Sequence, residues 1–138
     1  MDFKICSLNV RGLGERLKRR ETLNWLRVKK FCIYLLQETH CSENTTATWS
    51  SEWGYKTLFS RCSGASGGVA IFFNNNFVFQ FQRSYLDPKG RFIINFVILK
   101  QMKGFSLWLQ FTHQMMTILP FLRVSLATCE IFIVTIYF

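Results

Sequence analysis

Apolar residues occur along this chain in two rhythms, which together predict a mixed α/β fold. The mostly apolar run over Phe3–Val10 predicts a strand, and the continuous apolar run over Phe31–Gln37 is typical of a strand that is buried on both faces. The segment between them, Glu15–Lys30, is rich in helix-forming residues and carries one broad apolar face. A strand, a helix and a second strand in this order form the unit from which a parallel sheet is built.

The remainder of the first hundred residues predicts a meander of strands. The polar stretch Cys41–Ser51 comes first and is assigned to no element. Turns rich in Gly and Asn, and the Asp-Pro-Lys-Gly turn at 87–90, then separate short apolar runs. The strands expected from these runs are Tyr55–Phe59, Val69–Phe73, Phe77–Arg83 and Arg91–Leu99.

The composition changes near residue 101. Residues 1–100 hold 15 of the 17 basic and 7 of the 8 acidic residues, and the tail is apolar without the period of a strand or an amphipathic helix. A membrane span over Ile118–Phe138 would have the right length. However, Arg123 and Glu130 lie inside it, and each central charge costs about 2.5–3.5 kcal/mol on insertion. No membrane association is therefore expected.

Two strand ends carry groups that could hold a metal ion. Asn9 lies at the end of the first strand, and Glu38 follows the second in Leu35-Leu36-Gln37-Glu38-Thr39-His40. A carboxylate and an amide oxygen are ligands that a hard divalent cation accepts beside a phosphate. Taken singly, each residue is more often a strand-end amide or a solvated carboxylate.

The charge and the cysteines narrow the partners and the compartment. A net charge of +9 favours a polyanionic partner, with nucleic acid first and an anionic membrane second. Five cysteines without a C-x-x-C pair indicate reduced thiols rather than a disulfide framework or a zinc site. Asp2 and Lys4 precede the first apolar run, so we expect no secretory signal and a nuclear or cytoplasmic protein.

Several motifs in the correct order resemble one family. They are S-L-N-V-R-G-L, the basic helix, L-L-Q-E-T-H, a pair of tryptophans, S-G-A-S-G-G-V-A-I and D-P-K-G-R-F-I. Over about residues 3–100 the chain resembles the N-terminal part of the endonuclease domain of LINE-type retrotransposons. That domain belongs to the endonuclease/exonuclease/phosphatase superfamily, with the apurinic/apyrimidinic endonucleases and DNase I.

The resemblance implies a fold, a cofactor and site residues. The fold would be the N-terminal, incomplete part of a DNase I-like four-layer α/β sandwich, spanning residues 1–102. Glu38 would bind Mg²⁺ (or Mn²⁺) near the scissile phosphate, and Asn9 would orient the metal and the phosphate. DNA would be the partner, without a small-molecule cofactor. Basic residues near the site are expected to contact the nucleic acid, namely Arg11, Lys18, Arg19 and Arg20.

Two residues near these motifs differ from the roles that the family assigns. His40 is expected to be a surface or hydrogen-bonding histidine, because the family's catalytic histidine lies in a later S-D-H motif. Cys32 stands where relatives commonly carry an aspartate before the strand. This difference puts the hydrogen bonding at the start of the strand in doubt, but not the metal site.

The family's later motifs, I-Y-A-P-N, G-D-F-N and S-D-H, do not occur in this chain. The segment Gln110–Thr117 can be back-translated so that, read one nucleotide earlier, it gives I-Y-A-P-N-D-D. The two ATG codons of Met115 and Met116 force the two aspartates. We therefore interpret residues 103–138 as an out-of-frame continuation of the same domain.

Four functional hypotheses stay open at this point. The first is a Mg²⁺-dependent endonuclease, inactive on its own because the general base is missing. The second is a catalytically dead nucleic-acid binder that uses the basic helix, including Arg27, Lys29 and Lys30. The third is a non-functional product with uncovered sheet edges. The fourth is a protein anchored to a membrane by its apolar tail.

Overall fold

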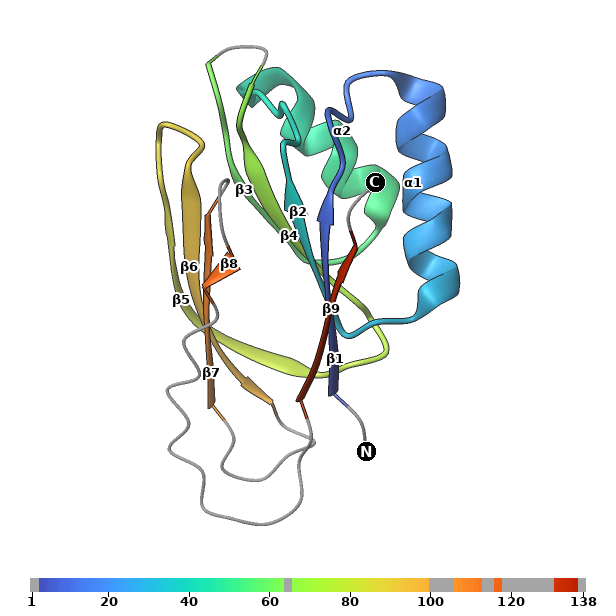
Figure 1. The fold of residues 1–138 in the computed structure, drawn as a ribbon. Helices are drawn as coiled ribbons and strands as arrows, with labels where there is room; N and C mark the ends of the chain where they lie inside the picture. Colours follow the sequence, from blue (N-terminus) through green and yellow to red (C-terminus); the bar gives the residue numbers. More distant parts are fainter. Residues whose placement is uncertain (1–2, 64–65, 100–105, 113–115, 118–130, 137–138) are drawn as a thin grey trace.

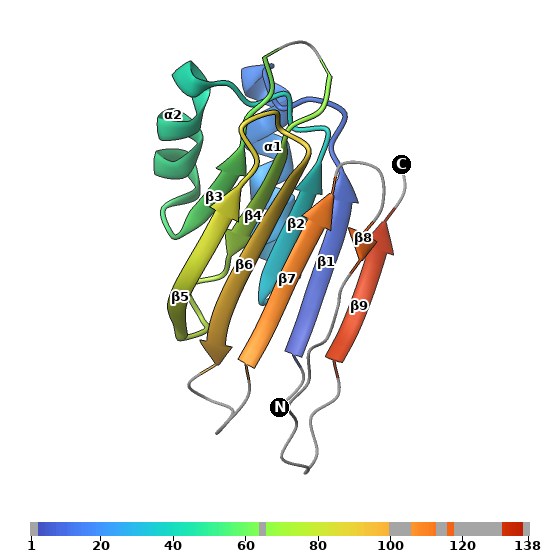
Figure 2. The same cartoon turned by 90° about the vertical axis from the view of Figure 1, so that its left-hand side faces the viewer.

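Two β-sheets pack face to face, and two helices cover the outer face of the first sheet (Figure 1). The computed structural model describes residues 3–63, 66–99, 106–112, 116–117 and 131–136. Figure 2 shows the second sheet in front, the first sheet behind it and the helices at the back. This arrangement gives three layers, and no helix covers the outer face of the second sheet within these ranges.

The first sheet has the strand order β3-β4-β2-β1-β9. At its centre β1 (Phe3–Asn9) and β2 (Ile33–Gln37) run parallel, as the strand–helix–strand unit predicts. β4 (Val69–Phe73) pairs antiparallel with β2 and with β3 (Thr57–Ser60). All five residues of β4 and the first four of β2 are buried, because layers cover both faces of the sheet.

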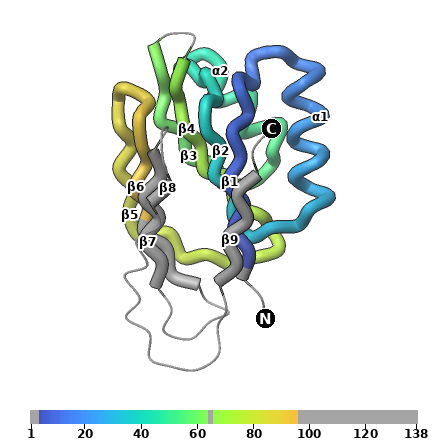
Figure 3. Tube along the Cα trace, in the orientation of Figure 1, coloured from blue at the N-terminus to red at the C-terminus, as the bar shows by residue number. Residues whose placement is uncertain are grey.

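The turn between β4 and β5 carries the chain into the second sheet (Figure 3). Its antiparallel strands are β5 (Phe79–Leu86), β6 (Phe92–Leu99), β7 (Ser106–Thr112) and β8 (Met116–Thr117). β5 begins two residues later and ends three residues later than predicted, and a register shift lies between Phe81 and Arg83. The bulge lets the strand continue past the polar residues at which the apolar pattern stops.

Helix α1 (Arg16–Lys29) confirms the predicted helix to within one residue at either end. The Glu15 carboxylate caps it by accepting hydrogen bonds from the backbone N–H groups of Lys18 and Leu17, and these bonds lower the pKa of Glu15. The helix ends at Lys30, whose backbone is left-handed with φ 53°. Its buried face includes Leu23 and Leu26, which pack on the first sheet.

Helix α2 (Glu43–Trp53) lies in the stretch to which the sequence analysis assigned no element. The prediction was wrong because the segment has few of the apolar residues that reveal a helix by periodicity. Its beginning is instead set by a capping box between Ser42 and Thr45, and its end by Gly54 at φ 83°. Trp49 and Trp53, one turn apart, are both buried against the first sheet.

Two apolar clusters hold the layers together. One lies between the sheets and includes Ile33, Ile71, Phe73 and Ile93. The other joins the helices to the first sheet around Tyr34. There the Trp53 indole packs edge-on against the Tyr34 ring and at a tilt against the Phe72 ring. Trp53 Nε1 also donates to the carbonyl of Phe73 at 2.8 Å, so the indole's polar edge is satisfied inside the core.

Strands occur in the tail to which the sequence analysis gave no period. β7 and β8 extend the second sheet, and β9 (Ile131–Ile136) pairs parallel with β1 at the edge of the first. The missing period does not exclude strands, because a continuous apolar, β-branched run has no alternation to detect yet still favours a strand. The predicted domain boundary at 102/103 falls outside the described residues, as does most of the window Ile118–Phe138. No helix in the described ranges is long and apolar enough to span a membrane.

Candidate active site at the carboxyl ends of β1 and β2

The parallel pairing of β1 and β2 brings Asn9 and Glu38 to one edge of the first sheet. Asn9 is paired with Gln37, and Glu38 is the next residue after Gln37. Both strands end at the upper end of the molecule in Figure 1. Both side chains are partly exposed, and that of Glu38 retains 29 % of its accessible surface. The two residues chosen from the sequence therefore lie side by side at a solvent-accessible strand end.

The backbone at this end adopts conformations that ordinary residues rarely take. Arg11, Glu38 and His40 have φ values of 48°, 54° and 55°, and Gly12 has φ 84°. Non-glycine residues with such values are uncommon, and they persist only where surrounding contacts hold them. These four positions belong to the two loops that follow β1 and β2.

Hydrogen bonds hold the two loops against each other. Beyond the last paired strand residues, Gly12 N donates to the carbonyl of Glu38 at 2.6 Å, and Leu13 N donates to that of Thr39 at 3.1 Å. A Cβ atom at Gly12 would lie 2.8 Å from His40 Nδ1, so only glycine allows the loops to approach this closely. The left-handed turn at Glu38 is thus fixed by its neighbour.

A glycine pair braces the Glu38 loop from the other side. Thr39 N and His40 N donate to the carbonyls of Gly68 and Gly67 at 3.1 and 3.0 Å. Gly68 N donates in turn to the carbonyl of Gly90, in the turn between β5 and β6. The S-G-A-S-G-G motif and the D-P-K-G turn thus converge on the loop that carries Glu38.

The side chains of Asn9 and Glu38 each contact a group within the site. Asn9 Oδ1 accepts from the backbone N–H of Arg11 at 3.0 Å, which fixes the amide at the strand end. Glu38 Oε2 lies 3.4 Å from His40 Nε2. His40 is therefore a partly buried hydrogen-bonding residue beside the carboxylate, and its closeness follows from the left-handed backbone at both residues.

The residue types at this strand end are those that a Mg²⁺ ion with few protein ligands would use. Mg²⁺ is commonly bound by one or two carboxylates, with water and substrate phosphate completing an octahedron. Glu38 supplies one carboxylate, and the second lone pair of Asn9 Oδ1 adds an amide oxygen. Within the described part of the chain, no group of three or more His, Cys, Asp or Glu residues is placed to hold a metal ion. A bound metal would thus depend on Glu38, on Asn9 and on oxygens from outside the protein.

Three of the four predicted DNA-contact residues are accessible near this site. Arg11 and Arg20 are exposed, and Lys18 is partly exposed. Lys18 Nζ donates to the carbonyl of Arg11 at 2.8 Å, which holds its charge beside the loop after β1. These cations therefore stand at the same end of the molecule as Glu38.

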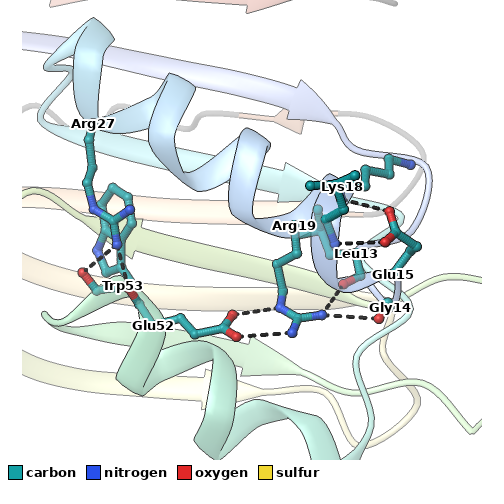
Figure 4. A network of polar contacts seen from close by, with 9 residues as sticks. Leu13, Gly14, Glu15, Lys18, Arg19, Arg27, Glu52 and Trp53 are labelled. Carbon is teal, nitrogen blue, oxygen red and sulfur yellow. Dashed lines mark hydrogen bonds and ion pairs between the residues drawn. The ribbon is translucent and has the colours of Figure 1, made fainter.

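Arg19, the fourth, has a structural role (Figure 4). Its guanidinium is buried and forms two hydrogen bonds with the Glu52 carboxylate, at 2.6 and 3.0 Å. It also donates to the carbonyls of Leu13 and Gly14 at 2.9 and 3.1 Å. All donors that face the protein are therefore used to join α1, α2 and the loop after β1. We leave Arg19 out of the candidate DNA contacts.

Cys32 makes the strand-start hydrogen bond that the sequence put in doubt. Its Sγ accepts from the backbone N–H of Lys4 at 3.4 Å, and its own N–H donates to the carbonyl of Lys4 at 2.8 Å. Burial raises the pKa of the Cys32 thiol, so the neutral form is favoured. A thiol is a weaker acceptor than a carboxylate, yet these two hydrogen bonds still join the beginning of β1 to the residue before β2.

Comparison with known proteins places this geometry in context. No protein-family model matches the sequence. Over 77 residues, or 56 % of this chain, the sequence is 30 % identical to the Transposon TX1 uncharacterized 149 kDa protein of Xenopus laevis. The match spans 6 % of the length of that protein.

The solved structures include a clear likeness in fold. The human Nocturnin catalytic domain, with bound sulfate anion, matches 75 % of this chain and 46 % of its own length. The TM-score is 0.52 at 20 % sequence identity. This chain is similar to a short part of a transposon protein and has a DNase I-like fold. Both likenesses agree with the resemblance predicted from the motifs, and the fold confirms the predicted partial α/β sandwich.

Proposed function

We propose that this chain carries the N-terminal half-site of a Mg²⁺-dependent endonuclease of the retrotransposon type, which nicks DNA. The observation that carries the proposal is the convergence of Asn9 and Glu38 on one edge, held by left-handed backbone at Glu38. Backbone strain of this kind concentrates at functional sites. The transposon relative and the DNase I-like fold make phosphodiester chemistry the reaction class to test.

In this proposal Glu38 binds the metal, and Asn9 orients the metal and the scissile phosphate. The metal, when bound, polarises the phosphoryl oxygen and neutralises charge on the leaving oxygen. Attack by water also needs a general base, and the sequence lacks the S-D-H motif that supplies one in relatives. We therefore expect metal and DNA binding without turnover by this chain alone.

Metal binding can be measured separately from cleavage. Mn²⁺ titrated into the full chain should lose its free-ion electron paramagnetic resonance signal on binding, and Glu38→Gln should weaken this binding about tenfold or more. Glu43→Gln is a matched control, because the Glu43 side chain is 87 % exposed on α2. Equal Mn²⁺ binding by the Glu38 variant and the control would remove Glu38 from the metal site.

Cleavage is tested with supercoiled plasmid and Mg²⁺. We expect no nicking above background by the full chain, because its sequence lacks the S-D-H motif from which the family's general base comes. Nicking that disappears in Glu38→Ala would show that the chain is active alone and that a base has been overlooked. Nicking that persists in Glu38→Ala would point to a contaminating nuclease.

DNA binding without cleavage is a second candidate function, favoured by the cations near the site. Each phosphate neutralised by Arg11, Lys18 or Arg20 should contribute about 0.9 to the slope of log K against log salt for duplex DNA. Lys18→Gln should therefore flatten the slope by about one contact, whereas Lys29→Gln, at the far end of the same helix, should not. Binding that does not change with salt would exclude this function.

A further inference from the structure

A polar groove lies at the opposite end of the molecule from Glu38. Four segments meet there, namely the end of α1, the end of α2, the residues that lead into β3 and the turn between β4 and β5. The groove has a volume of about 220 Å³ and is lined by Arg27, Lys30, Trp53, Tyr55 and the asparagines at positions 74–76. Neither Asn9 nor Glu38 lines it.

The groove has a positive rim without a carboxylate in its lining. Arg27 is fixed in place, because its guanidinium donates to the carbonyls of Glu52 and Trp53 and lies 5.3 Å from the centre of the Trp53 ring (Figure 4). Lys30 is exposed, and its left-handed backbone turns the chain at the edge of the groove. The nearest acidic residue of α2, Glu52, is held by Arg19. The groove therefore suits an anionic group.

Aromatic and amide groups complete the lining. Tyr55 retains 38 % of its surface, which makes it one of the exposed large side chains of the described residues. Asn74 is buried and shapes the turn, since its Oδ1 accepts from Asn76 N at 2.9 Å and its carbonyl accepts from Phe77 N. Asn75 and Asn76 are exposed. Amides offer both donors and acceptors, which is what the edge of a nucleobase requires.

We propose that this groove binds a nucleotide, with its phosphate at Lys30 and Arg27 and its base against Tyr55. Aromatic side chains bind bases by stacking, and cations track the phosphates of single strands. The volume is smaller than that of most ligand pockets, so it suits one nucleotide rather than a duplex. The nucleotide is either a free mononucleotide or one unit of a single strand. The proposal does not depend on the metal site, which lies at the other end of the chain's first sheet.

The test uses the full chain and two probes, adenosine monophosphate and a fluorescein-labelled ten-residue oligothymidylate. Lys30→Gln and Tyr55→Ala should each weaken binding about tenfold, whereas Tyr55→Phe should retain it because the ring is kept. Lys89→Gln, which removes an exposed lysine from the β5–β6 turn, should leave binding unchanged. Tighter binding of the oligonucleotide supports a single strand as the source, and equal binding supports a free nucleotide.

Two outcomes would overturn the proposal. One is wild-type affinity in both Lys30→Gln and Tyr55→Ala when circular dichroism shows these variants to be folded. The other is competition by inorganic phosphate that is as strong as that by adenosine monophosphate, since this would identify a simple anion patch without base recognition. If the Tyr55→Ala chain fails to fold, the nucleotide affinities of Lys30→Gln and Tyr55→Phe test the proposal.

Discussion

Replacing Arg19 by alanine should strongly destabilise the chain, because this side chain joins three segments at once. It forms a paired contact with Glu52 and donates to two carbonyls of the loop after β1. The Arg19 side chain is 9 % exposed, whereas that of Glu52 is 34 % exposed. The guanidinium also lies 5.5 Å from the centre of the Trp49 ring.

The magnitude follows from what the substitution leaves behind. Breaking a fully buried ion pair costs about 3–5 kcal/mol, since one charge remains without a partner. Here the remaining charge, Glu52, can be hydrated, so this part of the cost is smaller. The carbonyl of Leu13 loses a buried hydrogen bond, at about 1–3 kcal/mol. We expect Arg19→Ala to lower the free energy of unfolding by about 2–4 kcal/mol, and Glu52→Gln by about 1 kcal/mol.

Urea unfolding followed by tryptophan fluorescence measures this loss, with Trp49 next to the site as a reporter. Arg20→Ala is the matched control, because Arg20 is the next residue of α1 and is exposed. It should change the free energy of unfolding by less than about 0.5 kcal/mol. Equal midpoints for Arg19→Ala and Arg20→Ala would refute the reasoning.

The same contact has a pH signature. Arg19 lowers the pKa of Glu52 by hydrogen bonding, so Glu52 contributes stability above its unfolded pKa of 4.5. That contribution disappears as the pH falls through the depressed pKa of the folded state. The wild-type chain should therefore lose stability below about pH 4.5, and Arg19→Ala should lose less over this range. Parallel pH profiles for the two chains would contradict the assignment.

Two further predictions concern the loops that brace the site. Hydrogen bonds from Arg91 lower the pKa of the buried Asp87 carboxyl to about 2. Asp87→Asn should therefore lower the free energy of unfolding by about 1–2 kcal/mol at pH 7. It should also remove the loss of stability between about pH 4 and pH 2, which urea midpoints across that range measure. If the Asp87→Asn variant loses stability between about pH 4 and pH 2 as the wild-type chain does, the Asp87–Arg91 contact is not the cause of that loss. Gly68→Ala should cost about 1–3 kcal/mol and lower the Tm, because Gly68 has φ 81° and a Cβ there would lie 2.8 Å from Thr39 Oγ1. Gly14→Ala, where a Cβ meets no atom within 4 Å, is the control.

The sequence predicted the central part of the fold because buried strands there have an apolar pattern that is easy to recognise. β2 is covered on both faces, so its apolar run is continuous, and its parallel pairing with β1 then places Asn9 next to Glu38. The left-handed backbone of Glu38 could not be predicted, since nothing in a glutamate codes for positive φ. It results from hydrogen bonds that the neighbouring loops provide.

The predictions failed where contacts join distant segments or where apolar periodicity is weak. Arg19 was expected to contact nucleic acid, yet its partner Glu52 lies 33 residues away on a helix that was not predicted. That helix could have been found from its caps, since a Ser42–Thr45 capping box and a glycine at 54 enclose a pair of tryptophans spaced one turn apart. The predicted reading-frame change after residue 103 remains to be tested by the genomic DNA.

The pairing of β1 with β9 has a consequence for the order of folding. Phe3 is paired with Ile131, so β1 leaves the ribosome well before the strand with which it pairs. At about 5–20 residues per second, synthesis of the intervening chain takes about 6 to 25 s. During this time one edge of β1 is open, and it can be filled by a strand of another nascent chain instead. The yield of correctly paired chains should therefore fall as the local concentration of chains during synthesis rises, since closing so long a loop is slow.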